Sequence, residues 1–122
     1  MSRDWVRAER RGRLAEWLAA WFLRAKGYRI LARRAKTPVG EIDLVARHRD
    51  VIIFVEVKAR RQLDGAREAL TSGQRRRIVR AASWYLQRQD RYRGLAIRFD
   101  LIAIAPLARP HHLQAAWRAD DP

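Results

Sequence analysis

The chain has 122 residues, enough for one domain with one modest hydrophobic core and too few for two. Its 27 Lys and Arg residues against 13 Asp and Glu residues give a formal net charge of +14, which favours a polyanionic partner, although an Arg-rich proteome would also produce such an excess. The lack of cysteine excludes disulfides, thiolate metal sites and cysteine nucleophiles, so any metal would need oxygen or imidazole ligands.

The N-terminal region superficially resembles a signal peptide, because Arg10, Arg11 and Arg13 precede an apolar run over residues 14–23. Glu16 interrupts this run, however, and no small-residue cleavage site follows it. No segment reaches the roughly 18 apolar residues that a membrane-spanning helix needs. We therefore expect a cytoplasmic protein with no membrane partner.

The first predicted element is a long helix over residues 3–26, which ends at the capping glycine Gly27. Its main apolar stripe follows helical spacing, and we interpret the tryptophans on it as packing residues: Leu14, Trp17, Leu18, Trp21, Phe22 and Ala25. A narrower stripe on the other side consists of Glu16, Ala19, Ala20 and Leu23. Two such faces predict a helix that is wedged against a sheet.

Apolar and alternating runs predict four strands, at residues 28–33, 41–46, 51–58 and 96–104. Turn residues at 37–40 follow the first strand, residues 47–50 connect a hairpin, and a loop occupies residues 62–73. An amphipathic helix is predicted over residues 74–88, and a short helix around Trp117. The order αβββαβ predicts an α/β fold with a mixed β-sheet flanked by helices, in which the second helix crosses between the third and fourth strands.

The predicted hairpin brings acidic side chains together. Folding it at its turn places Asp43 opposite Glu56, and Glu41 opposite Lys58, on one face of the sheet. This inference depends on the register, because a slip by one residue would send these groups to opposite faces. Glu41 then becomes either the ion-pair partner of Lys58 or an auxiliary metal ligand.

Opposed carboxylates repel each other, and burial makes the repulsion more costly unless a cation lies between them. Mg²⁺ or Mn²⁺ would suit this position, because hard ions prefer carboxylate, water and phosphate oxygens. Asp43 and Glu56 would hold the metal, while the ammonium of Lys58 would orient a water or stabilise developing charge on a phosphate. Taken alone, Glu56 and Lys58 would indicate only an exposed strand edge, since Glu-x-Lys is a common tripeptide.

The combination of motifs closely resembles the bacterial family UPF0102, or YraN-like proteins, over about residues 10–104. The resemblance rests on the following segments: Glu16 with Ala19 and Leu23, Gly27-Tyr28, GEIDLVA at 40–46, VIIFVEVKAR at 51–60, and Arg98-Phe99-Asp100. That family is similar to Holliday junction resolvases and other restriction-endonuclease-like PD-(D/E)XK enzymes. The resemblance implies a single nuclease-like domain over residues 1–122 with a tail at 105–122, catalytic residues Asp43, Glu56 and Lys58, and metal ligation by Glu16, Asp43 and Glu56. It also implies a homodimer.

Basic residues beyond the carboxylates are candidates for contacts with nucleic acid, either through the helix N-terminus or beyond the second hairpin strand, unless they form only a solvated face: Arg60, Arg61, Gln74, Arg75, Arg76, Arg77 and Arg80. Relatives usually carry Lys at Gln74, so a phosphate contact there is lost or replaced. We expect all three histidines at the surface, and we expect Asp100 to form a structural salt bridge with an Arg of the second helix. Trp5 remains a candidate for base stacking.

Three functions are compatible with these features. The first is a Mg²⁺- or Mn²⁺-dependent endonuclease that hydrolyses phosphodiester bonds of nucleic acid, most readily DNA and including branched or junction DNA. The second is a nucleic-acid-binding module on the same fold with little or no catalytic activity. The third, a basic ribosome-associated protein, explains the charge but not the opposed carboxylates.

Overall fold

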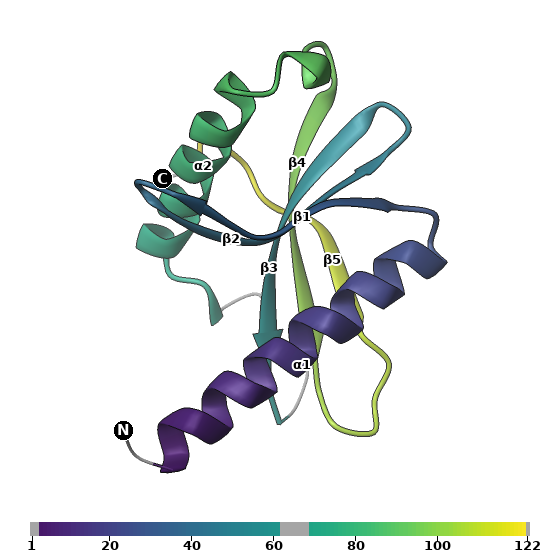
Figure 1. Cartoon of the computed structure of the whole chain (residues 1–122), viewed down its shortest axis with the longest axis vertical. Helices are drawn as coiled ribbons and strands as arrows, with labels where there is room; N and C mark the ends of the chain where they lie inside the picture. The colour runs from purple at the N-terminus through teal and green to yellow at the C-terminus, as the bar shows by residue number, and fades with distance from the viewer. Residues whose placement is uncertain (1–2, 62–68, 122) are drawn as a thin grey trace.

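The computed structural model describes residues 3–61 and 69–121, and for residues 3–11 it describes the backbone only. Its elements, in chain order, are α1 (Arg3–Ala25), β1 (Arg29–Thr37), β2 (Gly40–His48), β3 (Val51–Ala59), α2 (Ser72–Gln87), the 3₁₀ turn η2 (Asp90–Tyr92), β4 (Ala96–Ile104) and β5 (His111–Trp117) (Figure 1). The predicted order αβββαβ is confirmed, and β5 follows it. Residues 62–68 of the predicted loop and the side chain of Trp5 lie outside the described residues.

The described strands form one mixed sheet in the order β1-β2-β3-β4-β5. Neighbouring strands are antiparallel except β3 and β4, which run parallel from the pair Val51 and Ala96 to the pair Ala59 and Ile104. A parallel pair needs a crossover connection, and α2 lies on that connection. The predicted α/β class is confirmed: helices flank a mixed sheet, as in the restriction-endonuclease-like fold.

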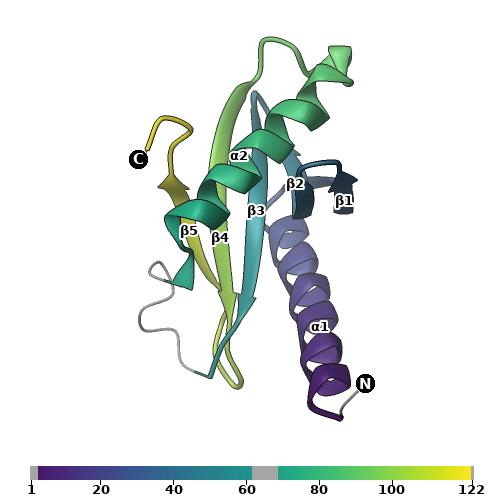
Figure 2. The same cartoon turned by 90° about the vertical axis from the view of Figure 1, so that its left-hand side faces the viewer.

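The two long helices cover opposite faces of the sheet (Figure 2). Alternate residues of β3 show this arrangement, because Ile52 and Phe54 pack in the cluster that includes α2, whereas Ile53 and Val55 pack in the cluster that includes α1. A strand buried on both faces is the expected outcome for a near-continuous apolar run. The middle of the sheet is therefore packed on both faces, and it supports the predicted carboxylates Asp43 of β2 and Glu56 of β3.

Helix α1 packs through the narrower of its two predicted stripes. Ala15, Ala19 and Leu23 are buried against the sheet, whereas Trp17 and Trp21 are exposed. The prediction that these tryptophans are packing residues is wrong, because small residues on the other face allow the helix to approach the sheet closely. Gly27 ends the helix with a positive φ of 94°, as predicted for a capping glycine.

Helix α2 begins two residues earlier than predicted because Thr71 caps it. The Thr71 hydroxyl accepts a hydrogen bond from the backbone N–H of Gln74, and the Gln74 side chain accepts one from the N–H of Thr71. This reciprocal pair is a capping box, which satisfies two N–H groups that the helix itself cannot.

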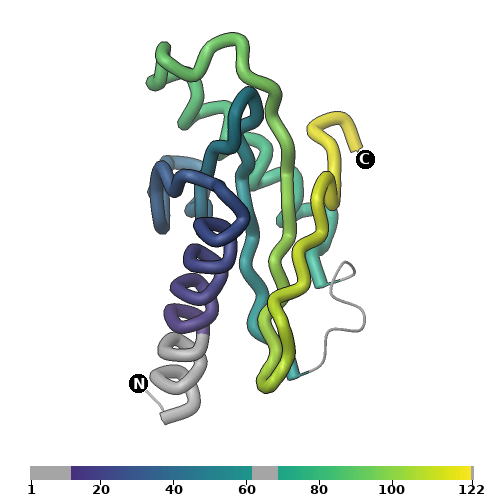
Figure 3. The backbone as a smooth tube through the Cα atoms, turned by 90° about the vertical axis from the view of Figure 1, so that its right-hand side faces the viewer, coloured from purple at the N-terminus to yellow at the C-terminus, as the bar shows by residue number. Residues whose placement is uncertain are grey.

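The C-terminal segment forms strand β5, not the predicted helix around Trp117. Trp117 pairs with Phe99 of β4, and their rings stack with centroids 5.6 Å apart. Trp117 is buried by this pairing. Figure 3 shows β5, in yellow, along the edge of the sheet. The strand forms because β4 would otherwise expose an unpaired apolar edge.

A buried polar network attaches β5 to the rest of the fold, and it contradicts two predictions. Asp100 is fully buried and binds Arg98 through two hydrogen bonds of 2.8 and 2.7 Å, so its partner is not an arginine of α2. His112, predicted at the surface, has a buried side chain whose Nε2 lies 2.7 Å from Asp100. Its Nδ1 lies 2.7 Å from the ammonium of Lys26. The network therefore connects β4, β5 and the segment that follows α1.

Burial would raise the pKa of Asp100, but the hydrogen bonds from His112 and Arg98 outweigh it and hold the pKa below the usual value. The amide of Ala115 donates a further hydrogen bond to the same carboxylate. Asp100 is thus an ionised group that three partners satisfy, which confirms its structural role.

Across residues 3–61 and 69–121, no helix has the length and apolar character to cross a membrane.

Candidate metal centre

The sheet divides at the predicted site. The β2–β3 pairing has the predicted register, with His48 opposite Val51, and its last pair is Leu44 with Val55. Beyond that pair, β2 stays bonded to β1 as far as Gly40, and β3 stays bonded to β4 as far as Ala59. Figure 1 shows the β1–β2 pair curving away from β3. The next facing residues along the register are Asp43 and Glu56, so the two carboxylates lie where the strands separate.

Where the backbone hydrogen bonds between β2 and β3 end, the side chain of Asp43 continues the connection between the two strands. Its carboxylate accepts a hydrogen bond of 2.8 Å from the backbone N–H of Val57. This contact satisfies a strand N–H that has no backbone acceptor on β2, and it fixes the carboxyl group of Asp43 beside Glu56. The position of Asp43 is therefore set by the backbone of both strands.

Burial and a like charge change the ionisation of this pair. Burial, followed by the negative charge of Glu56, raises the pKa of Asp43 from 3.8 to about 8. Burial also raises the pKa of Glu56, although the ammonium of Lys58 opposes the shift. The two carboxyl groups are close enough to hydrogen bond to each other. Around neutral pH the pair holds a proton that two isolated carboxyl groups would release.

Lys58 lies beside the pair, as predicted, but its partner differs from the expected one. Its ammonium is 3.6 Å from the carboxylate of Glu56. No ion pair joins Lys58 to Glu41 among the described residues. Glu41 is exposed and pairs across the ladder with Lys36 of β1. The predicted ion pair of Glu41 with Lys58 is wrong, because β2 leaves β3 before reaching it, and the auxiliary role of Glu41 stays a prediction.

Glu16 of α1 is the third acidic residue at this site. Its negative charge adds to the raised pKa of both Asp43 and Glu56, so the three acidic groups lie within electrostatic reach. The Glu16 carboxylate is held by the guanidinium of Arg34, at 2.7 Å. Sequence reasoning missed Arg34, which sits at a positive φ of 51° in β1, because nothing in the sequence predicts that local backbone.

The donor set fits a hard divalent cation in its chemistry, because two half-buried carboxyl groups that keep a proton between them favour any cation that replaces it. Over the described ranges, however, no three Asp, Glu, His or Cys side chains are close enough together to hold a metal ion. In this structure the Glu16 carboxylate is instead paired with Arg34. Metal ligation by Glu16, Asp43 and Glu56 stays a prediction.

The predicted nucleic-acid residues fall into two groups. Arg60 and Arg61 are exposed and follow Lys58 at the end of β3. Arg76, Arg77 and Arg80 are exposed on the first turns of α2.

The start of α2 lies against the start of β2. A Cβ atom on Gly40 would come within 3.0 Å of the Arg77 side chain, so the arginine passes directly over this glycine. Gly40 also has a φ of +153°, which other residues rarely adopt. The arginines of α2 are therefore placed beside the strand that bears Asp43. Gln74 is used in the capping box, so its side chain serves the helix first.

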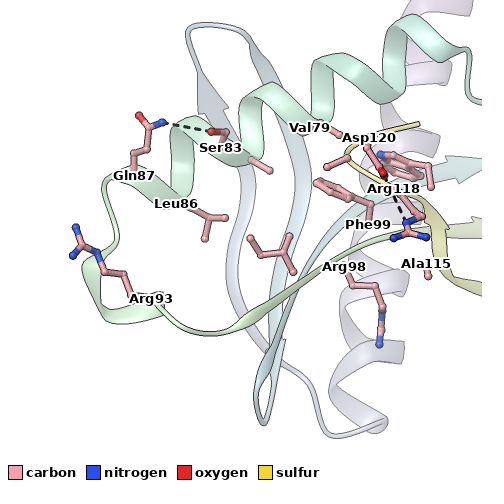
Figure 4. A pocket seen from close by; sticks show the side chains of 14 residues that line it. Val79, Ser83, Leu86, Gln87, Arg93, Arg98, Phe99, Ala115, Arg118 and Asp120 are labelled. Atoms are coloured by element: carbon pink, nitrogen blue, oxygen red, sulfur yellow. Dashed lines mark hydrogen bonds and ion pairs between the residues drawn. The ribbon is translucent and has the colours of Figure 1, made fainter. Parts of the chain in front are cut away.

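A pocket of about 1040 Å³ lies elsewhere, between α2, β4 and β5 (Figure 4). Leu86, Ile97, Phe99 and Trp117 form its apolar walls, and Arg93, Arg98 and Arg118 are among its polar lining residues. None of the predicted catalytic residues lines it. The candidate site thus lies where β2 and β3 separate, and it is distinct from this pocket.

Comparison with known proteins agrees with the motifs at the site. The profile described as "Uncharacterised protein family UPF0102" matches residues 15–104, a range that includes Glu16, Asp43, Glu56 and Lys58. The chain is 51% identical to a UPF0102 protein of Chelativorans sp., over 93% of this chain and 91% of the relative. It is 49% identical to one of Paramagnetospirillum magneticum, over 98% and 95%, and 52% identical to one of Mesorhizobium japonicum, over 91% and 89%. The chain belongs to the protein family UPF0102.

Proposed function

We propose that this protein is a Mg²⁺- or Mn²⁺-dependent endonuclease that hydrolyses phosphodiester bonds of nucleic acid, with DNA, including branched or junction DNA, as the preferred substrate. The observation that carries the proposal is the half-buried Asp43–Glu56 pair, with the ammonium of Lys58 3.6 Å from Glu56. A structural role explains this arrangement poorly, since placing two half-buried carboxyl groups side by side disfavours their ionisation and costs stability.

Each residue has a distinct task in this proposal. Asp43 and Glu56 would hold the divalent ion, which supplies charge neutralisation for the phosphate and lowers the pKa of a bound water. Lys58 reaches the same space and stabilises the charge that develops on the phosphate oxygens. Arg60, Arg61 and the exposed arginines of α2 would attract and orient the backbone of the substrate.

The ion pair between Glu16 and Arg34 favours a second candidate, a nucleic-acid-binding module with little activity. If Arg34 permanently neutralises Glu16, the site keeps only two metal-binding carboxylates. In the endonuclease, by contrast, Glu16 would hold the divalent ion in place of Arg34.

The test combines calorimetric titration of Mn²⁺ with a cleavage panel of labelled junction, flap, duplex and single-stranded DNA and RNA in Mg²⁺, Mn²⁺ or EDTA. Asp43→Asn and Glu56→Gln should weaken Mn²⁺ binding and abolish cleavage. Lys58→Ala should keep the metal and slow cleavage by about 100-fold or more, because it removes only charge stabilisation in the transition state. Asp90→Asn is the matched control, because Asp90 is an exposed carboxylate on η2.

Equal Mn²⁺ affinity in the wild type and Asp43→Asn, with unchanged DNA binding and no cleavage in either, would replace the endonuclease with the binding module. Cleavage that persists in EDTA would also contradict the proposal.

A further inference from the structure

The outward face of α1 is an unusual surface for a basic protein. Leu14, Trp17, Leu18 and Trp21 are 56%, 47%, 36% and 52% exposed. They follow helical spacing and therefore form one continuous stripe, on the side of α1 opposite its contact with the sheet. Trp17 and Trp21 contact each other edge to face, with ring centroids 6.2 Å apart. Two adjacent indole rings thus present aromatic surface to the solvent.

The stripe lies on the same helix as the candidate ligand Glu16, and helical spacing fixes its position relative to the basic residues of α1. Each helical residue advances about 100° around the axis. Arg13 and Arg24 therefore border Trp17 and Trp21 on the side that leads around the helix towards Glu16. The guanidinium of Arg24 lies 5.0 Å from the ring centre of Trp21. The stripe thus has basic groups directly beside its indole rings.

Charge determines which partner fits this face. A second copy would bring one chain of net charge +14 against another, with the arginines of both α1 helices beside the contact. A polyanion with exposed aromatic rings suits both features, because its phosphates match the arginines and its bases match the indoles. Paired bases in a duplex are already stacked within the helix, so the matching partner has unpaired bases.

We propose that the outer face of α1 is a stacking platform for unpaired bases, in which Trp17 and Trp21 contact successive bases and Arg13 and Arg24 contact the adjacent phosphates. The proposal rests on the proposed function, and it names the substrate class as a strand that is single-stranded at or beside the scissile bond. Binding is expected to be independent of sequence, because every base has an aromatic face.

The experiment compares two labelled strands of about 15 nucleotides, one of oligothymidine and one abasic, by fluorescence anisotropy in EDTA. The wild type should prefer oligothymidine by at least about 5-fold, since stacking contributes about 1–3 kcal/mol per base. The double variant Trp17→Ala/Trp21→Ala should lose this preference while its affinity for the abasic strand stays unchanged. Its melting temperature should also hold, because both side chains are exposed.

Trp84→Ala is the matched control. Trp84 is a half-buried tryptophan beside Arg88 on α2, which covers the opposite face of the sheet. It should keep the wild-type preference for oligothymidine.

Retention of the preference by the double variant would overturn the platform. So would sedimentation of the free wild type as a dimer that the double variant disrupts, because the face would then belong to a second copy. If the preference depends on the tryptophans but no cleavage occurs in Mg²⁺ or Mn²⁺, the proposed endonuclease is contradicted and the platform stands. If cleavage occurs without the preference, the platform is contradicted and the endonuclease stands.

Discussion

At the scale of one residue, Asp43 shows how this fold holds a carboxyl group where its ionisation is disfavoured. Its carboxylate accepts a hydrogen bond from the backbone N–H of Val57, which attaches it to the neighbouring strand. Burial then raises the pKa, and the nearby Glu56 raises it further. A group with these properties stabilises the fold when protonated and opposes it when ionised. The site is therefore poised to exchange a proton for another cation.

The metal-free protein should lose stability as the pH rises from about 4 to about 8. Asp43 keeps its proton in the folded chain up to about pH 8, whereas the unfolded chain releases it near 3.8, so rising pH favours unfolding through that interval. In Asp43→Asn the fall should be much smaller, and the variant should become relatively more stable towards pH 8. The measurement is urea unfolding at a series of pH values in EDTA. Parallel curves for the two proteins would show that Asp43 is ionised in the folded state.

The paired residues of the site were predictable from the sequence, whereas their partners were not. Asp43 and Glu56 lie in one hairpin, where strand alternation and a short turn set the register. The ion pair of Glu16 with Arg34 joins α1 to β1 and depends on the positive φ of Arg34, which has no sequence signal. The mistaken Glu41–Lys58 pair has a related cause, because the register was extended past the point where the strands separate.

At the scale of elements, β5 is the strand that the sequence pattern did not predict. Its segment contains a positive φ at Ala115, and its pairing with β4 shifts register between Phe99 and Leu101. These irregularities disrupt the alternation by which strands are recognised. By contrast, β3 and β4 were predicted closely, because their apolar runs are continuous and bounded by turn residues. The exposed stripe of α1 was misassigned because two apolar faces on one helix do not indicate which of them packs.

Asp100→Asn should lower the free energy of unfolding by about 3 kcal/mol, because it leaves Arg98 and His112 without their buried charged partner. It should also speed hydrogen exchange at the Leu113 amide, because the network attaches β5 to β4. Urea unfolding and exchange followed by NMR measure the two effects. Asp120→Asn, which changes an exposed carboxylate, should alter stability by less than about 0.5 kcal/mol. A loss of stability without faster exchange in β5 would mean that Asp100 serves the core and not the strand.

At the scale of the whole molecule, the position of a basic residue determines whether it would contact a substrate at the candidate site. The net charge of +14 attracts any polyanion, but only the arginines near the division of the sheet would meet a substrate at the carboxylates. Arg76 and Arg80 are exposed near the start of α2, whereas Arg91 and Arg93 are exposed in and after η2, beyond its other end. These two pairs carry the same charge at different ends of one helix.

Affinity for single-stranded DNA should fall steeply with salt, with a log–log slope of about −0.7 per phosphate contacted. Arg76→Glu/Arg80→Glu should make the slope shallower by about two contacts. Arg91→Glu/Arg93→Glu, with an identical change in net charge, should leave the slope close to that of the wild type. Anisotropy titrations between about 50 and 200 mM salt measure it. Equal effects of the two pairs would indicate that overall charge, and no particular surface, governs binding.

The division of the sheet has a consequence for the order in which the protein folds. The residues on either side of it, Asp43 and Glu56, belong to one hairpin closed by the short Arg49-Asp50 turn, so their contact has low contact order. The parallel pairing of Val51 with Ala96 requires the whole α2 crossover to be in place, and such long-range closure is slow. We expect the carboxylates to meet in a nascent hairpin, where water still screens their repulsion. The unfavourable free energy of burying the carboxylates would then arise only in the later step, when β4 docks and the helices cover the sheet.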